Sequence, residues 1–202
     1  KINVAGTTNI DWVLDNFFEK PKNYSDKIKI INNYEKKYLS KSFNQNSLIF
    51  LPYVNYGGSI SPFVNLNSKA EIFGILPHHN SYDILTACYE GLALSIKDCY
   101  GSKIKNNESL YLAGGASKSK ILPQLISNVL NVKVKILSST ELGALGIAYL
   151  ISSFLYKKDL KVLINKNQKI SQIYYPNKFN SKYLKQKYVK YKKLRESLYN
   201  IW

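Results

Sequence analysis

Two adjacent glycines, Gly114 and Gly115, carry the clearest chemical signal in the chain. They follow an apolar run, residues 109–113, and they precede apolar residues at helical spacing in 119–130. A glycine turn between a strand and a helix lets backbone N–H groups approach a nucleotide closely, because no side chain stands in the way. Glycine pairs also mark ordinary tight turns, so the motif alone leaves both interpretations open.

The other residues of catalytic type favour structural roles. His78 and His79 are neighbours whose side chains point apart on an extended chain, so a surface loop suits them better than a metal site. Glu90 lies in an apolar helical segment without a second acid, and we expect it to make a structural hydrogen bond or a cap contact. Lys118 and Lys120 flank the glycines and are either phosphate ligands or ordinary exposed lysines.

Length and composition indicate one domain with a substantial apolar core. The chain has 202 residues, of which 45% are hydrophobic. Cys88 and Cys99 are eleven residues apart in one predicted helix, which is too far for a disulfide, and both suit buried positions. No apolar run is long enough to cross a membrane and no signal-peptide pattern is present, so we expect a cytoplasmic protein without a membrane partner.

The net charge of +16 has to be weighed against its distribution. Arg195 is the single arginine, and residues 151–202 hold 13 basic residues against Asp159 and Glu196. Specific contacts to bases and phosphates favour arginine over lysine. The charge therefore favours a solvated basic face over a nucleic-acid site, and an acidic partner surface is the remaining alternative.

The sequence contains no methionine. An intact translated chain normally begins with one. We therefore expect the sequence to be part of a longer protein, unless its methionines were replaced.

The glycine turn needs a framework of helices and strands to hold it. Hydrophobic spacing predicts helices at 9–19, 26–39, 82–100, 119–130, 140–155 and 181–202, strands at 47–54, 109–113 and 132–137, and a loop over 55–70. The order strand, helix, strand, helix over 109–155 indicates an α/β domain. We expect Thr8 or Asn9 to cap the first helix, and Ser139 or Thr140 to cap the helix that starts at 140.

Two of these helices have faces that suit tight packing. The helix at 140–155 has one smooth side, which suits contact with a sheet or a nucleotide and consists of Gly143, Ala144, Gly146 and Ala148. The helix at 181–202 has an apolar stripe opposite its lysines, and we expect it to dock on its own domain. The stripe consists of Leu184, Tyr188, Tyr191, Leu194, Leu198 and Ile201.

Three segments in a fixed order resemble one enzyme family. The first is Phe50–Val54, a strand end with Leu-Pro-Tyr, and the second is Ala70–Glu90, a small residue and a glycine followed by an apolar helix. The third joins Gly114–Ser119 to the glycine- and alanine-rich segment Glu141–Ala148. Together they are similar to the C-terminal lobe of the FGGY carbohydrate kinases, the group that includes xylulose, L-xylulose, glycerol, ribulose and fucolose-type sugar kinases.

Two segments fit the family pattern less well. Residues 55–59 stand where the family has a Gly-Glu-Arg-type loop but lack the acid and the arginine, which favours subgroups acting on other pentuloses or deoxysugars. Ala5–Thr8 imitates the family's phosphate-holding turn, but Asn9–Trp12 follows directly and Leu51 lies only 39 residues beyond Trp12. We therefore expect the true turn to lie upstream.

The resemblance implies a ribonuclease H-like, actin-like ATPase fold of the α/β class. It also implies an enzyme that moves the γ-phosphoryl group of Mg-ATP to a sugar hydroxyl, with ATP and Mg²⁺ as cofactors. The ATP-binding residues that it implies are Gly114, Gly115, Ala116, Ser117 and Ser119. The first three approach adenosine and phosphates through their backbone, and Ser119 stands at the polar position that contacts the adenine.

The resemblance places the remaining machinery outside this chain. Residues 1–202 correspond to the C-terminal, nucleotide-side domain, whereas the catalytic aspartate lies in the part that precedes it. We expect no catalytic residue and no metal ligand in this chain, and no activity of this lobe alone. The expected partners are a sugar and the N-terminal lobe, and a homodimer is an option. The alternative is a split or degenerate nucleotide-binding module without phosphoryl transfer.

Overall fold

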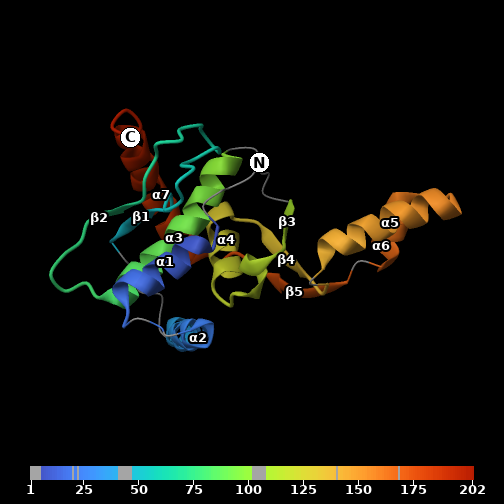
Figure 1. The fold of residues 1–202 in the computed structure, drawn as a ribbon, viewed down its shortest axis with the longest axis horizontal. Helices are drawn as coiled ribbons and strands as arrows, with labels where there is room; N and C mark the ends of the chain where they lie inside the picture. The colour runs from blue at the N-terminus through green and yellow to red at the C-terminus, as the bar shows by residue number, and fades with distance from the viewer. Residues whose placement is uncertain are drawn as a thin grey trace.

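Helix α3 (Ser81–Tyr100) runs through the centre of the molecule, a computed structural model (Figure 1). The structure describes residues 6–19, 21, 23–40, 47–101, 108–139, 141–167 and 169–202. The other elements in chain order are α1 (Thr8–Phe17), α2 (Tyr24–Ser40), β1 (Ile49–Leu51), β2 (Glu71–Phe73), β3 (Ser109–Leu112), the 3-10 turn η1 (Gly115–Lys118), α4 (Leu122–Leu130), β4 (Lys133–Leu137), α5 (Leu142–Tyr156), α6 (Leu160–Asn167), β5 (Ile170–Tyr174) and α7 (Lys178–Leu198). Helices α1, α4 and α7 and strand β1 pack against α3.

The sequence of α3 explains its position. A capping box fixes its start, since the Asn80 side chain accepts from the backbone N–H of Tyr82 and the Asp83 carboxylate accepts from the backbone N–H of Asn80. At Gly91 a Cβ would lie 2.3 Å from the carbonyl oxygen of Phe50. Glycine at this position therefore lets β1 pack directly on the helix backbone.

Two small sheets complete the α/β architecture. Strands β3 and β4 pair in parallel, with Ser109 opposite Lys133, and β5 pairs with β4 in the antiparallel sense. The parallel pair is connected through η1 and α4, the kind of crossover that parallel strands require. Strands β1 and β2 form a separate antiparallel pair. The predicted α/β class and the predicted order of strands and helices over 109–155 are confirmed.

Helix α7 docks on its own domain, as its apolar stripe predicts. Leu184 and Tyr191 are fully buried, and the helix contacts α3, α4 and β1. The residues after its C-terminal end lie over the loop at 55–70, where the Trp202 ring stacks on Phe63 with 5.9 Å between ring centroids. The prediction is wrong at Ile201, which is 76% exposed because the helix ends before it.

Helices α5 and α6 form a hairpin that projects away from the rest of the molecule (Figure 1). None of the residues of α5 is buried in the described chain, although the helix is strongly apolar. Its predicted smooth side lies open, since no described atom lies within 4 Å of where a Cβ would stand at Gly143 or Gly146. Of the two contacts that this side suits, with a sheet or with a nucleotide, the described residues do not show the first.

Several elements differ from the sequence prediction in extent or presence. Strand β1 covers three residues of the predicted 47–54, and β2, α6 and β5 were not predicted. Thr7 occupies the N-cap of α1 without a side-chain cap bond, so Thr8 and Asn9 do not cap it. Glu141 occupies the N-cap of α5, two residues beyond Ser139, and Thr140 lies outside the described residues.

Candidate functional site

The glycine turn lies where β3 ends and α4 begins. Gly114 has φ 73° and ψ −157°, a backbone conformation open to glycine and strained for other residues. The turn closes on the Gly114 carbonyl oxygen, which accepts from the backbone N–H of Ser117 at 3.1 Å and from its hydroxyl at 2.7 Å. Gly114 and Gly115 are exposed, and Ala116 is partly exposed, so the backbone of the turn is accessible from solvent.

Ser119 joins this turn to α4. Its hydroxyl donates to Glu35 Oε1 at 2.6 Å and accepts from the backbone N–H groups of Ile121 and Leu122 at 3.2 and 3.1 Å. These N–H groups stand at the start of α4, where the helix itself offers them no acceptor. The Ser119 side chain therefore holds the helix start in place through both its proton and its lone pairs.

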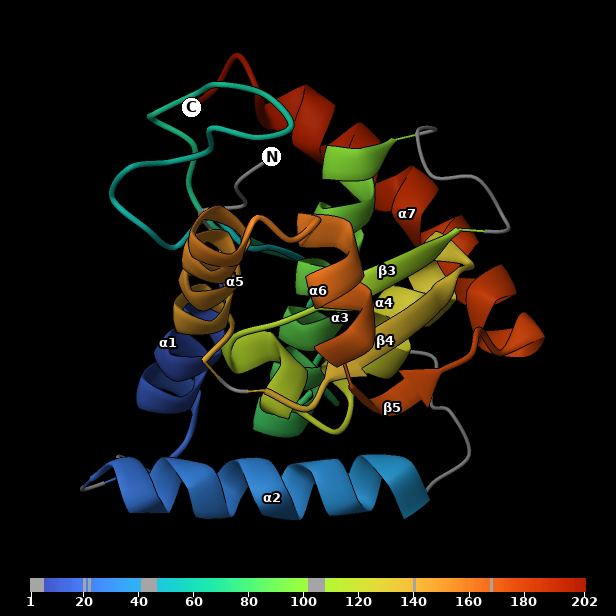
Figure 2. The same ribbon diagram turned by 90° about the vertical axis from the view of Figure 1, so that its right-hand side faces the viewer.

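Glu35 is the residue that sequence reasoning missed. It lies on α2, 84 residues before Ser119, and is only 2% exposed. The same Oε1 atom accepts from the backbone N–H of Lys120 at 3.0 Å. Figure 2 shows α2 lying along one end of the molecule, and Tyr34 anchors it by donating a hydrogen bond to Thr86 of α3. The one local signal was an acid beside an aromatic residue in an otherwise lysine-rich helix.

If the turn binds ATP, as the family resemblance implies, replacing Glu35 by alanine is expected to raise the KM for ATP about tenfold while the KM for the sugar changes little. The change leaves the Ser119 hydroxyl and the Lys120 N–H without their acceptor, at about 1–3 kcal/mol, and loosens the end of the turn. Steady-state kinetics of the full-length protein, with each substrate varied in turn, measures the effect.

The matched variants are Glu35→Gln, which keeps an acceptor oxygen, and Glu19→Ala, which removes an exposed carboxylate. Glu35→Gln should recover most of the loss and Glu19→Ala should leave both KM values unchanged. A Glu35→Ala protein that loses thermal stability but keeps its KM for ATP would show that Glu35 supports the fold alone.

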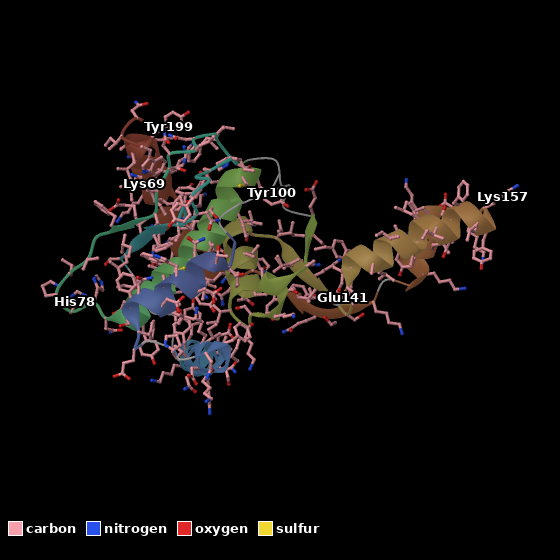
Figure 3. The ribbon with its side chains drawn as sticks, in the orientation of Figure 1. Lys69, His78, Tyr100, Glu141, Lys157 and Tyr199 are labelled. Carbon is pink, nitrogen blue, oxygen red and sulfur yellow. The ribbon has the colours of Figure 1, made fainter. Side chains whose placement is uncertain are left out.

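The remaining candidates take the places expected of structural residues. Glu90 is fully buried and pairs with Lys187 of α7, which confirms its structural role. His78 and His79 lie before α3, and Figure 3 shows His78 at the edge of the molecule. The His79 ring accepts from the backbone N–H of Leu76. Cys88 and Cys99 are buried free thiols, as predicted.

Two lysines flank the turn. The side chains of Lys118 and Lys120 are exposed beside it. Among the described residues, no three His, Cys, Asp or Glu side chains gather where a metal ion could bind. Within the same residues, no helix is both long and apolar enough to cross a bilayer.

Sequence comparison decides the family. The model of the C-terminal domain of the FGGY family of carbohydrate kinases matches residues 1–153. The chain belongs to this family. The glycine turn, the helix after it and the start of the α5–α6 hairpin all lie inside the matched part of this FGGY domain.

Individual FGGY relatives are distant and longer. Erythritol kinase of Brucella abortus is 28% identical over 152 residues, which cover 72% of this chain and 28% of that protein. The probable L-xylulose kinase of Haemophilus influenzae is 27% identical, with 96% of this chain and 37% of that protein covered. The chain thus spans 28–37% of the length of these curated relatives.

Solved structures share the fold of this FGGY domain. Gluconate kinase of Lactobacillus acidophilus superimposes on 97% of this chain with a TM-score of 0.81 at 22% identity, and 39% of that chain is covered. Plasmodium falciparum glycerol kinase with ADP gives a TM-score of 0.73 at 21% identity, over 96% of this chain and 37% of that one. At these identities the likeness confirms the α/β fold.

Proposed function

We propose that this chain is the nucleotide-side lobe of an ATP-dependent carbohydrate kinase with a ribonuclease H-like, actin-like fold. The enzyme moves the γ-phosphoryl group of Mg-ATP to a hydroxyl group of a pentulose or a related sugar. The observation that carries the proposal is an exposed glycine turn, with Gly114 at φ 73°, inside the segment that matches the FGGY C-terminal domain. One relative of this fold was solved with ADP.

The two glycines of the turn face open space. No described atom lies within 4 Å of a Cβ built on Gly114, and a Cβ on Gly115 meets only Thr7 Oγ1, at 3.7 Å. We assign backbone contacts with adenosine and phosphates to Gly114, Gly115 and Ala116, and a contact at the edge of the same turn to Ser117. Bound ATP would supply the phosphoryl group, and the protein contributes position and charge neutralisation.

Ser119 is assigned to the adenine. Its hydroxyl already donates to Glu35 and accepts from two backbone N–H groups. An adenine contact through this hydroxyl therefore requires Ser119 to exchange one of these partners. Mg²⁺ is assigned to the substrate phosphates and to the part of the enzyme upstream, because the described residues offer no cluster of ligands.

The α5–α6 hairpin is assigned to the boundary with the upstream lobe. Glu141 and Lys157 mark its base and its tip (Figure 3), and along it large apolar side chains are exposed, among them Ile147 at 60% and Phe154 at 84%. Such an apolar surface is unusual on a protein face that stays in water. The matching kinases carry more than half of their length outside the region that superimposes on this chain.

A split or degenerate nucleotide-binding module is the second candidate. The loop at 55–59, which lacks the acid and arginine of the family pattern, favours it. In this loop Gly58 has φ 56°, and a Cβ there would lie 2.4 Å from the Asn65 carbonyl oxygen, so the glycine serves the turn that brings Ser59 opposite Asn65. The residues at 55–59 thus form a defined turn although they include neither an acid nor an arginine.

The test is ADP release by the full-length protein with Mg-ATP and a panel of erythritol, xylulose, L-xylulose, glycerol and gluconate. We expect stoichiometric ADP and phosphorylated product with one of these or a related sugar, and none with residues 1–202 alone. ATP binding without turnover of any sugar would favour the module. Failure to bind ATP at all would overturn both candidates.

A further inference from the structure

A basic cavity lies at the C-terminal end of α4, the opposite end from the glycine turn. Its volume is about 610 Å³, within the range of small-molecule sites. Helices α3 and α4 end beside it and α7 begins there; Tyr100, labelled in Figure 3, marks the end of α3. The residues that line it are Lys97, Gly101, Asn128, Val129, Leu130, Asn131, Lys178, Ser181, Lys182 and Lys185.

The lining contains four lysines and, among the described residues, no carboxylate. Lys178, Lys182 and Lys185 repeat along one face of α7, where equal charges repel one another. None of these three forms an ion pair within the described part of the chain. All three side chains are exposed, so solvent weakens their mutual repulsion, and a bound anion would neutralise it further.

Lys97 reaches the same cavity from α3. Its ammonium group donates to the Val129 carbonyl oxygen at 2.9 Å and lies 5.5 Å from the centre of the Tyr188 ring. Burial lowers the pKa of Lys97, and the charge of Lys185 lowers it further. The negative charge of an anion in the cavity would oppose both effects, because it favours the protonated ammonium group.

Ser181 adds a neutral donor. Its hydroxyl oxygen is buried and has no hydrogen-bond partner within the described residues. Unpaired buried polar atoms are rare in folded proteins and call for a partner. Ser181 also lines the cavity, in the first turn of α7, where the helix dipole favours negative charge.

Neutralisation of helix ends is the competing explanation for these lysines. The C-terminal ends of α3 and α4 carry partial negative charge at the cavity. Lys97 donates a hydrogen bond to a helix carbonyl, at Val129. Within the described residues the three lysines of α7 make no such contact, which leaves their ammonium groups available to an anion.

We propose that this cavity binds a small anion with two or more phosphate groups, at a site separate from the nucleotide turn. Three ammonium groups from α7 and one from α3 surround the anion, and the Ser181 hydroxyl donates to it. Lysine is well suited to phosphate as a point charge. The volume of this half-open cavity suits a small molecule rather than a nucleic-acid duplex, which needs an extended basic stripe.

The experiment measures binding of tripolyphosphate to the full-length protein by calorimetry, with saturating Mg-ADP present to fill the nucleotide turn. The test variant is Lys178→Ala/Lys182→Ala/Lys185→Ala. The control is Lys190→Ala/Lys192→Ala/Lys193→Ala, which removes the same charge from exposed positions further along α7. We expect Kd to rise at least tenfold in the test variant and less than twofold in the control.

A second variant separates the site from general charge. Ser181→Ala removes the buried hydroxyl without changing charge, and we expect it to raise Kd about threefold to tenfold with an unchanged melting temperature. Equal Kd values in wild type and test variant would overturn the proposal, and so would equal losses in test and control variants. A third result would also overturn the proposal. The wild-type protein would bind a random oligonucleotide but no tripolyphosphate, and the test variant would bind the oligonucleotide at least tenfold more weakly.

Discussion

Replacing Gly115 by valine in the full-length protein is expected to raise the KM for ATP by about ten- to a hundredfold, with little change in melting temperature. A Cβ at Gly115 would meet only Thr7 Oγ1, at the ordinary contact distance of 3.7 Å, so the free turn accommodates a side chain. The added methyl groups stand on the exposed surface that the nucleotide is proposed to approach. Each tenfold loss corresponds to about 1.4 kcal/mol of binding free energy.

Gly114→Ala serves as the contrasting variant. Here no described atom lies within 4 Å of the new Cβ, but φ of 73° strains any other residue by about 1–3 kcal/mol. We expect this change to lower the melting temperature and to raise the KM for ATP together, because it moves the turn itself. Gly57→Ala, in a loop position with free space and ordinary backbone, is the control and should change neither quantity.

Steady-state kinetics with ATP varied at saturating sugar, together with calorimetric binding of ADP, measures these effects. Gly115→Val with an unchanged KM for ATP and unchanged ADP affinity would place the nucleotide elsewhere. Gly114→Ala that lowers stability without affecting ATP would show that the turn is structural only. The two variants thus separate a blocked surface from a distorted one.

Local sequence patterns predicted most of the framework around the turn. Apolar spacing gave the central helix α3 within one residue of its start, because its capping box and its continuous buried face are both encoded in consecutive residues. The turn at Gly114 could be located for the same reason, since a strand, a glycine with positive φ and a helix follow one another in the chain. Such features depend on neighbours in sequence.

The features that could not be predicted from the sequence depend on contacts between residues far apart in the chain. Glu35 reaches the turn from a helix 84 residues upstream, and nothing within α2 states which segment it will contact. Strand β5 forms because β4 offers its free edge, with Lys135 opposite Ile173. The smooth side of α5 suits either a sheet or a nucleotide, and nothing in its own residues shows that the helix projects away from the domain. Short polar strands and exposed helices lack the periodicity on which prediction rests.

Lys187→Ala is expected to lower the free energy of unfolding by about 3–5 kcal/mol, which is a large share of a domain's total stability. Lys187 is 5% exposed and pairs with Glu90, which is fully buried. Burial raises the pKa of Glu90 against the opposing effect of Lys187, and burial lowers the pKa of Lys187 against that of Glu90. Removing the lysine leaves a carboxyl group in an apolar site without its partner.

The double variant Glu90→Gln/Lys187→Met tests this explanation. Neutral side chains of similar size remove both charges at once, and buried ion pairs are often replaced in this way at little cost in stability. We expect it to recover at least half of the loss, whereas Lys192→Ala, on the exposed side of the same helix, changes stability by less than about 0.5 kcal/mol. Urea unfolding of each protein gives the values.

The outcome decides why a lysine stands between the buried residues Leu184 and Tyr191 on α7. A double variant with near-normal stability would mean that Lys187 is needed because Glu90 is there, and that shape and volume hold α7 on α3. A double variant as unstable as Lys187→Ala would contradict this, because the pair itself would then anchor the helix. The Tyr183 hydroxyl, 3.3 Å from the Lys187 ammonium group, would in that case belong to the same network.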